Sequence, residues 1–173
     1  IVIHGLNRDA DNYFSYLING LRQENFEDQS ILIAPFFQSA STAQSHELYW
    51  SDAGWREGQN SDGAINISSF TVLDQIIQQL ADTERFPVLE TIIIAGHSSG
   101  ALFTQAYAAA NSSESTYPNL NFRYVVANSQ YFYYPDDLRY DDASGQFILV
   151  SGCTTYNRWP LGFVVPPPYL STT

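Results

Sequence analysis

The chain alternates between short continuous apolar runs and longer amphipathic stretches. Four runs rich in aliphatic residues predict strands buried on both faces: Ile1–Ile3, Ile31–Ala34, Thr91–Ala95 and Tyr124–Ala127. Apolar residues at helical spacing predict helices over Phe14–Leu21, Phe70–Leu80 and Ser99–Ala110. This alternation implies right-handed crossovers, and it predicts an α/β fold, a three-layer sandwich around a mostly parallel open sheet.

The helix starts are marked by polar residues that can cap them. Asp9 or Asp11 precedes the first helix, and Ser68 or Ser69 precedes the second. Side-chain oxygens at this position accept hydrogen bonds from otherwise unpaired backbone N–H groups. The sequence therefore predicts these residues as N-caps.

Two stretches depart from the alternation. Residues 36–67 form a long polar connection that carries Tyr49, Trp50 and Trp55, and residues 128–173 are irregular, aromatic and rich in proline. Long connections in a compact domain are often functional rims or lids. We expect one domain over residues 1–173 with rim or lid segments at 36–67 and 128–173, and Phe147–Val150 as either another strand or part of a lid.

Composition limits the classes of function. Of the 173 residues, 45% are hydrophobic and 14% charged, which indicates a globular core. The net charge of −11 disfavours nucleic acid by long-range repulsion and fits a soluble protein. No apolar run is long enough for a membrane-spanning helix. The sequons Asn66-Ile67-Ser68 and Asn111-Ser112-Ser113 raise secretion as a hypothesis, and the oligomeric state stays open.

The sequence predicts neither a metal nor a cofactor. No cluster of His, Cys and Asp has metal-ligand spacing, and no glycine-rich phosphate loop is present. Cys153 is the single cysteine, so no disulfide can form within these residues. We interpret it as a buried thiol, the alternative being a partner outside these residues.

The residues that indicate chemistry are Gly96-His97-Ser98-Ser99-Gly100, directly after a predicted strand and before a predicted helix. This is the G-x-S-x-G pattern of a nucleophile elbow in its proper context. Gly96 and Gly100 are needed because a Cβ there would collide with neighbouring elements. Ser98 is therefore the predicted nucleophile, and the Ser99 N–H at the helix start would face a developing oxyanion.

A second loop supplies the other predicted oxyanion donor. His4-Gly5 follows the first strand, and Gly5 lets the backbone approach a substrate carbonyl. The N–H of Leu6 or Asn7 would then point at the oxyanion. Arg8 could orient this loop through backbone carbonyls, the alternative being a simple exposed position.

These residues resemble the α/β-hydrolase fold family, in its esterase and lipase branch. The chain is more closely similar to bacterial and fungal hydrolases distantly related to polyester depolymerases and feruloyl esterases. The resemblance implies hydrolysis of small-molecule, lipid or aryl esters through an acyl-serine intermediate. The matching stretches are HGLNRDADNYF at 4–14, WREGQNSDG at 55–63, SSF at 68–70, AGHSSG at 95–100, VANS at 126–129 and YNRWPLG at 156–162.

The catalytic triad of this family cannot be completed in its usual order. That order is serine, acid, histidine, but no histidine follows Ser98 and no acidic residue follows Asp142. Asp136 and Asp137 are candidate acids, with a solvated acidic loop as the alternative interpretation. No residue of the chain is therefore predicted as the base.

The three histidines have other predicted roles. His97 should point away from Ser98 as a packing residue, His4 should shape the oxyanion loop, and His46 should be solvated. We therefore expect that the chain is a fragment lacking the first and last strands of the fold, and inactive alone. The alternatives are a non-catalytic binding module of the same fold and an acyltransferase.

Overall fold

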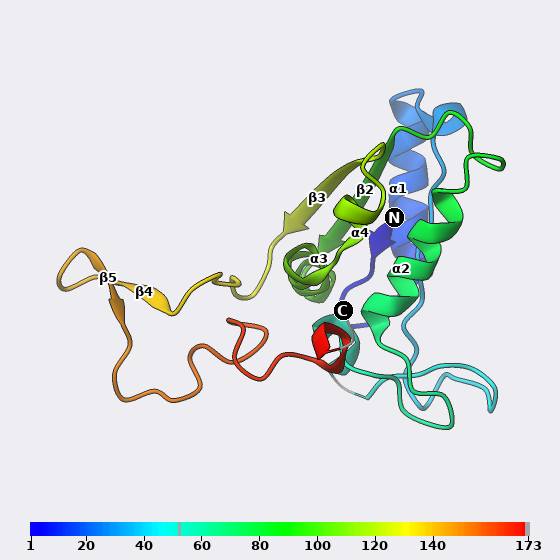
Figure 1. Cartoon of the computed structure of the whole chain (residues 1–173). Coiled ribbons are helices and arrows are strands. Elements are labelled where there is room, and N and C mark those ends of the chain that lie inside the picture. Colours follow the sequence, from blue (N-terminus) through cyan, green and yellow to red (C-terminus); the bar gives the residue numbers. More distant parts are fainter. Residues whose placement is uncertain (52, 172–173) are drawn as a thin grey trace.

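The computed structural model describes residues 1–51 and 53–171, and it has the predicted α/β class. Its centre is a parallel sheet of three strands in the order β1–β2–β3 (Figure 1). Ile3 pairs with Gly96, and Gly96 pairs in turn with Val126. The strands are β1 (Val2–Ile3), β2 (Thr91–His97) and β3 (Asn121–Ala127).

The strand predicted over Ile31–Ala34 is wrong. The segment has no strand structure, although it lies beside β1 and the Val2 N–H donates to the Ile33 carbonyl at 2.8 Å. β1 is only two residues long, and Pro35 has no N–H to extend the pairing. The apolar run therefore lies beside β1 without forming a strand.

The predicted burial on both faces is also wrong for β2 and β3. Burial alternates along β2: Ile92 and Ile94 are buried, whereas Ile93 is 44% exposed. On β3, Val125 is 50% exposed. The described helix α3 packs on β1, β2 and β3, while α1 contacts the sheet at β1. Among the described helices, α3 therefore provides most of the cover of the sheet, and β3 has no buried residue.

All three predicted helices form. Asp9 occupies the N-cap of the first helix without a side-chain capping bond. Ser68 caps the second, and its hydroxyl accepts a hydrogen bond from the Phe70 N–H at 3.1 Å. The described helices are α1 (Ala10–Gln23), α2 (Ser69–Leu80), α3 (Ser99–Ala110), the unpredicted α4 (Ser113–Thr116) and the 3-10 turns η1 (Glu27–Gln29), η2 (Gly54–Glu57) and η3 (Pro168–Ser171).

Aromatic side chains fill the core between α2, α3 and residues 36–67. Trp55 is fully buried and stacks on Phe37, with ring centroids 5.6 Å apart. Phe70 and Phe103 meet edge to face at 5.1 Å, an arrangement favoured by the ring quadrupoles. The 36–67 connection is therefore anchored in the core by its aromatic residues, and η2 is held against α3.

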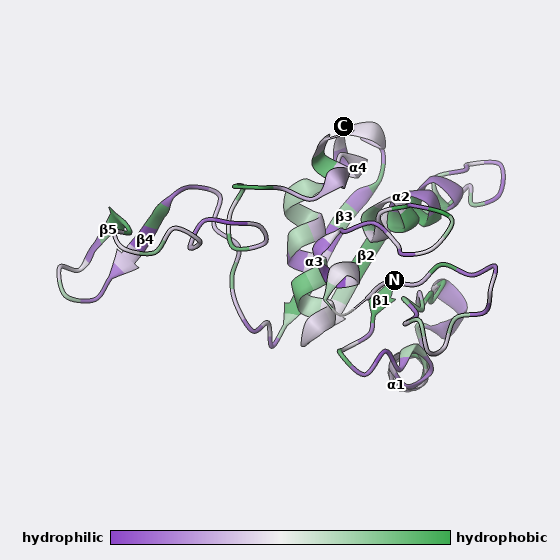
Figure 2. Cartoon of the chain, turned by 90° about the horizontal axis from the view of Figure 1, so that it is seen from below, coloured by the Kyte–Doolittle hydropathy of each residue, from purple (hydrophilic) through white to green (hydrophobic). Residues whose placement is uncertain are grey.

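Residues 128–171 leave the body and return to it. They contain an antiparallel hairpin of β4 (Leu138–Asp141) and β5 (Gln146–Leu149), so the predicted Phe147–Val150 segment is a strand of a separate sheet. The hairpin stands away from the body in two perpendicular views (Figure 1 and Figure 2). Trp159 then docks on the core, where its Nε1 donates to the Glu57 carbonyl at 2.7 Å.

Two surface properties complete the fold. Cys153 is exposed, which contradicts the predicted buried thiol, because it lies on the irregular segment after β5 and not in a packed element. Across residues 1–51 and 53–171, none of the helices combines the length and apolarity that crossing a bilayer requires.

Candidate active site

Ser98 connects β2 to α3 through an unusual backbone conformation. Its φ is 58° and its ψ is −120°, a combination that L residues rarely adopt and that costs about 1–3 kcal/mol. The Ser98 N–H donates to the Ala127 carbonyl at 3.0 Å, and the Ser98 carbonyl accepts from the Ala101 N–H at 3.0 Å. The turn is thus tied to β3 on one side and to α3 on the other.

The two flanking glycines allow close contact between α3 and the sheet. A Cβ built on Gly96 would overlap the Gly100 carbonyl and lie 2.5 Å from Thr104 Oγ1. A Cβ built on Gly100 would overlap the Ile3 carbonyl and lie 2.7 Å from the His4 carbonyl oxygen. Because these neighbours are mostly backbone, side chains at 96 and 100 would push α3 away from the strands.

The Ser98 side chain is accessible at the carboxyl end of the parallel sheet. The residue is partly exposed, and its Oγ has no hydrogen-bond partner among residues 1–51 and 53–171. In open α/β sheets this edge is where ligands bind. The hydroxyl is thus placed to meet a ligand.

Backbone N–H groups that could bind an oxyanion lie at the start of α3 and in the loop after β1. Ser99 is the first residue of α3, so its N–H has no acceptor within the helix. Leu6 and Asn7 occupy the middle of a turn closed by the Arg8 N–H donating to the Gly5 carbonyl at 3.1 Å. That closing bond does not engage the N–H groups of Leu6 and Asn7.

The loop after β1 is packed against the Ser98 turn. A Cβ built on Gly5 would lie 3.9 Å from the His97 carbonyl oxygen and 2.7 Å from Tyr13 Oη. Residues about ninety positions apart therefore meet at one point of the sheet edge. The predicted donor loop and the predicted nucleophile are brought together.

Arg8 fixes the other side of the same loop. Its Nη1 donates to the carbonyls of Phe37, Gln38 and Trp50 at 3.3, 2.5 and 2.8 Å. These contacts confirm the prediction that Arg8 binds backbone carbonyls. They attach the loop to the 36–67 connection.

His4 is a buried structural residue in this geometry. Its Nε2 accepts from the Phe37 N–H at 3.1 Å, so in the neutral tautomer Nδ1 carries the proton and donates to the Gly5 carbonyl at 2.9 Å. Burial lowers the pKa of His4, which favours this neutral form. Both ring nitrogens are engaged away from Ser98.

Among residues 1–51 and 53–171, the rings of the other histidines form no hydrogen bond with Ser98 either. The predicted packing role of His97 is wrong, because its side chain is exposed and lies 3.3 Å from Tyr13 Oη and 3.0 Å from Asn128 Nδ2. It bridges α1 to the residue after β3. His46 is exposed in the 36–67 connection.

The candidate acids lie at the base of the β4–β5 hairpin. Asp136 and Asp137 are both exposed, and Asp136 Oδ1 accepts a hydrogen bond from the Leu138 N–H at 2.9 Å. Within the described part of the chain, neither carboxylate forms a hydrogen bond with Ser98 or with a histidine. The structure does not bring them to the nucleophile.

Sequence reasoning missed Arg56. Its Nη1 donates to Ser99 Oγ at 3.1 Å, although 43 positions separate the two residues. Arg56 lies in one of the stretches that carry the family resemblance. The pattern of apolar residues in the 36–67 connection does not show that this connection folds back onto the start of α3. The contact could not be found from local patterns.

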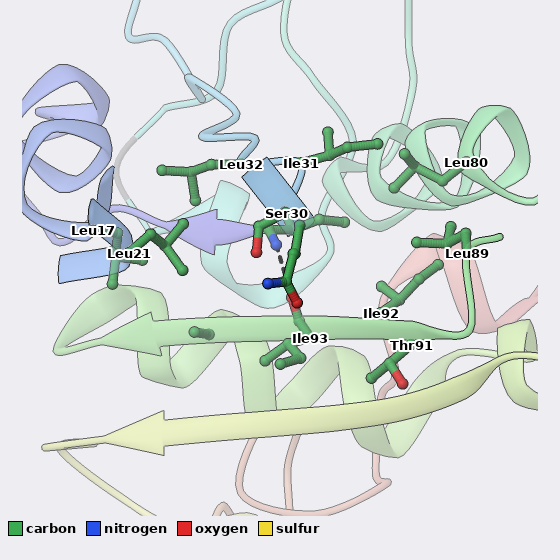
Figure 3. Close-up of a pocket in the computed structure, with 13 residues that line it drawn as sticks. Leu17, Leu21, Ser30, Ile31, Leu32, Leu80, Leu89, Thr91, Ile92 and Ile93 are labelled. Atoms are coloured by element: carbon green, nitrogen blue, oxygen red, sulfur yellow. Dashed lines mark hydrogen bonds between the residues drawn. The ribbon is translucent and has the colours of Figure 1, made fainter. Parts of the chain in front are cut away.

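An apolar cavity lies apart from this site. It has a volume of about 400 Å³ and lies along β2, between α1 and the segment 29–32 (Figure 3). Apolar side chains dominate its walls, among them Leu17, Leu21 and Ile93.

No group of three or more potential metal ligands occurs in residues 1–51 and 53–171.

Comparisons with known proteins add no relative. The chain matches no protein-family model, and neither a curated protein nor a solved structure matches it. A functional conclusion therefore depends on the geometry around Ser98 and on the resemblance of short stretches.

Proposed function

We propose that this protein is a serine hydrolase of carboxylic esters with the α/β-hydrolase fold, and that Ser98 is its nucleophile. The observation that carries the proposal is the Ser98 backbone, with φ 58° and ψ −120°, between a parallel strand and a helix start. A strained turn persists only where the surrounding structure enforces it, and such turns cluster at functional sites. An ordinary connection would not need a strained serine between two tightly packed glycines.

The groups around Ser98 fit the first half of ester hydrolysis. Ser98 Oγ would attack the ester carbonyl carbon, and the carbonyl π electrons would move to its oxygen. The N–H groups of Ser99 and of Leu6 or Asn7 would bind that oxyanion. Collapse would re-form the carbonyl and break the bond to the alcohol, which leaves with the proton from Oγ. Water would then hydrolyse the acyl-serine.

Proton transfer is the step that His4, His46 and His97 do not support in this geometry. None of them hydrogen bonds to Ser98. A hydroxyl without a base is a weak nucleophile at neutral pH. We therefore expect residues 1–173 to give little ester turnover. Asp136 or Asp137 would act as the acid only after a rearrangement that brings the β4–β5 hairpin to Ser98.

Covalent labelling tests the proposal directly. The complete protein is treated with a fluorophosphonate, in which serine Oγ bonds to phosphorus and fluoride leaves, and the labelled peptide is identified by mass spectrometry. We expect labelling at Ser98, loss of label in Ser98→Ala and normal labelling in Ser30→Ala, an exposed serine with ordinary backbone angles.

Two outcomes would contradict the proposal. An unlabelled Ser98 in the folded protein would favour the non-catalytic binding module, and label retained by Ser98→Ala would move the nucleophile elsewhere. If Ser98 is labelled, assays of nitrophenyl ester with and without an added alcohol acceptor distinguish hydrolysis from acyl transfer, since both share the acyl-serine.

A further inference from the structure

Arg56 approaches the Ser98 turn from a separate part of the chain. It lies in η2, which packs against α3, and its Nη1 donates to Ser99 Oγ at 3.1 Å. Ser99 is 1% exposed and directly follows the proposed nucleophile. The hydrogen bond therefore joins the 36–67 connection to the residue whose N–H faces the proposed oxyanion.

The position is electrostatically costly for a cation. The N-terminus of a helix carries partial positive charge, so an arginine there is repelled by the helix dipole. The Arg56 side chain is only 18% exposed, and its Nε is buried without a hydrogen-bond partner in the described part of the chain. A half-buried guanidinium in such a place needs a compensating interaction.

Glu57 is the salt-bridge partner of Arg56 in the described part of the chain, at a long distance. Its Oε1 lies 3.8 Å from Arg56 Nε, beyond hydrogen-bond distance. Burial raises the pKa of Glu57, whereas the attraction of the Arg56 charge lowers it. Arg56 therefore places a positive charge beside the start of α3.

We infer that Arg56 is a positioning residue of the Ser98 site: its guanidinium fixes Ser99 through Oγ and adds positive potential where the oxyanion would form. The inference rests on the proposed function, because it concerns the reactivity of Ser98. It gives a role to a cation held against a helix N-terminus, because negative charge would develop there during reaction. Preorganised charge of this kind stabilises a transition state without reorganisation.

The test measures the second-order rate constant for fluorophosphonate labelling of Ser98 in the complete protein. The variants are Arg56→Met, Arg56→Lys, Ser99→Ala and the double variant Arg56→Met/Ser99→Ala. Arg22→Met is the matched control, because Arg22 is an exposed arginine whose partner is Glu27 in the described structure. Thermal unfolding of each variant is recorded in parallel.

We expect Arg56→Met to lower the rate about tenfold, the scale of one hydrogen bond to a charged group. Arg56→Lys should recover part of the loss because it keeps the charge, and Ser99→Ala should also slow labelling. The double variant should be slower by less than the product of the two single effects, because both remove the same interaction. Arg22→Met should react like the wild type.

Other results would overturn the inference. Wild-type rates in Arg56→Met would remove any role in reactivity, and fully independent effects in the double variant would exclude action through Ser99. Equal losses in Arg56→Lys and Arg56→Met, together with lowered thermal stability, would show a purely structural residue. A wild-type protein that is not labelled at Ser98 would overturn both this inference and the proposed function, whereas the other outcomes leave the proposed function standing.

Discussion

The strain at Ser98 predicts that removing the nucleophile can stabilise the protein. At φ 58° and ψ −120° a side chain crowds its own backbone, whereas glycine adopts this conformation freely. We expect Ser98→Gly to unfold at higher urea concentration than Ser98→Ala, although neither can react. The alanine variant keeps the Cβ and the strain, so it serves as the matched reference.

The magnitude follows from two opposing effects. Relief of strain at one residue contributes about 1–3 kcal/mol. Glycine makes the unfolded chain more flexible, which costs about 0.5–1 kcal/mol relative to alanine. The free energy of unfolding of Ser98→Gly should therefore exceed that of Ser98→Ala by about 1 kcal/mol, or about 2–4 °C in Tm for a chain of this size.

A second position isolates the strain. Ser30 is exposed with φ −135° and ψ 143°, ordinary extended values. There glycine should be less stable than alanine by about 0.5–1 kcal/mol, from chain flexibility alone. The difference between the two glycine–alanine comparisons, measured by urea unfolding followed by circular dichroism, should be about 1–3 kcal/mol. A difference near zero would refute the strained turn, and with it the main support for the proposed function.

Two further predictions concern packing and pH. Gly100→Ala should lower the free energy of unfolding by about 3 kcal/mol, because its Cβ would overlap the Ile3 carbonyl. Gly20→Ala in α1, with open space around it, should raise the free energy of unfolding by about 0.5–1 kcal/mol. Urea unfolding of both variants checks this, and a Gly100→Ala variant as stable as the wild type would contradict the close contact. Burial raises the pKa of Asp74 above its usual 3.8, despite hydrogen bonds that include one from Tyr107 Oη at 2.6 Å, so the folded state holds its proton more tightly than the unfolded state. The free energy of unfolding therefore falls as the pH rises from about 3.8 through the raised pKa. In urea titrations between pH 4 and pH 7, Asp74→Asn should not show this decline. An unchanged decline in Asp74→Asn would contradict the assignment to Asp74.

The local features of this chain could be read from its sequence. The three long helices depend on apolar spacing and caps, and α3 begins and ends where the pattern predicted, at Ser99 and Ala110. The Ser98 turn was likewise visible, because a strand, two glycines and a helix within a few residues permit few backbone paths. The α/β class followed from the order of these elements.

Other features depended on neighbours that no local pattern identifies. Apolar runs predicted strands buried on both faces, yet cover by α3 on one side leaves Ile93 and Val125 exposed. The run at Ile31–Ala34 looked like a strand, but pairing also needs a partner of sufficient length, and β1 has two residues. His97 is exposed because Tyr13 and Asn128 hold its ring at the surface.

The division between the two kinds of information has a simple physical basis. Periodicity, capping and steric limits act between residues close in the chain, so the sequence by itself determined the helices, the class of fold and the strained turn at Ser98. The contact of Arg56 with Ser99 joins residues 43 positions apart. Such a contact depends on how the intervening chain folds back and packs, and only the tertiary structure decided it.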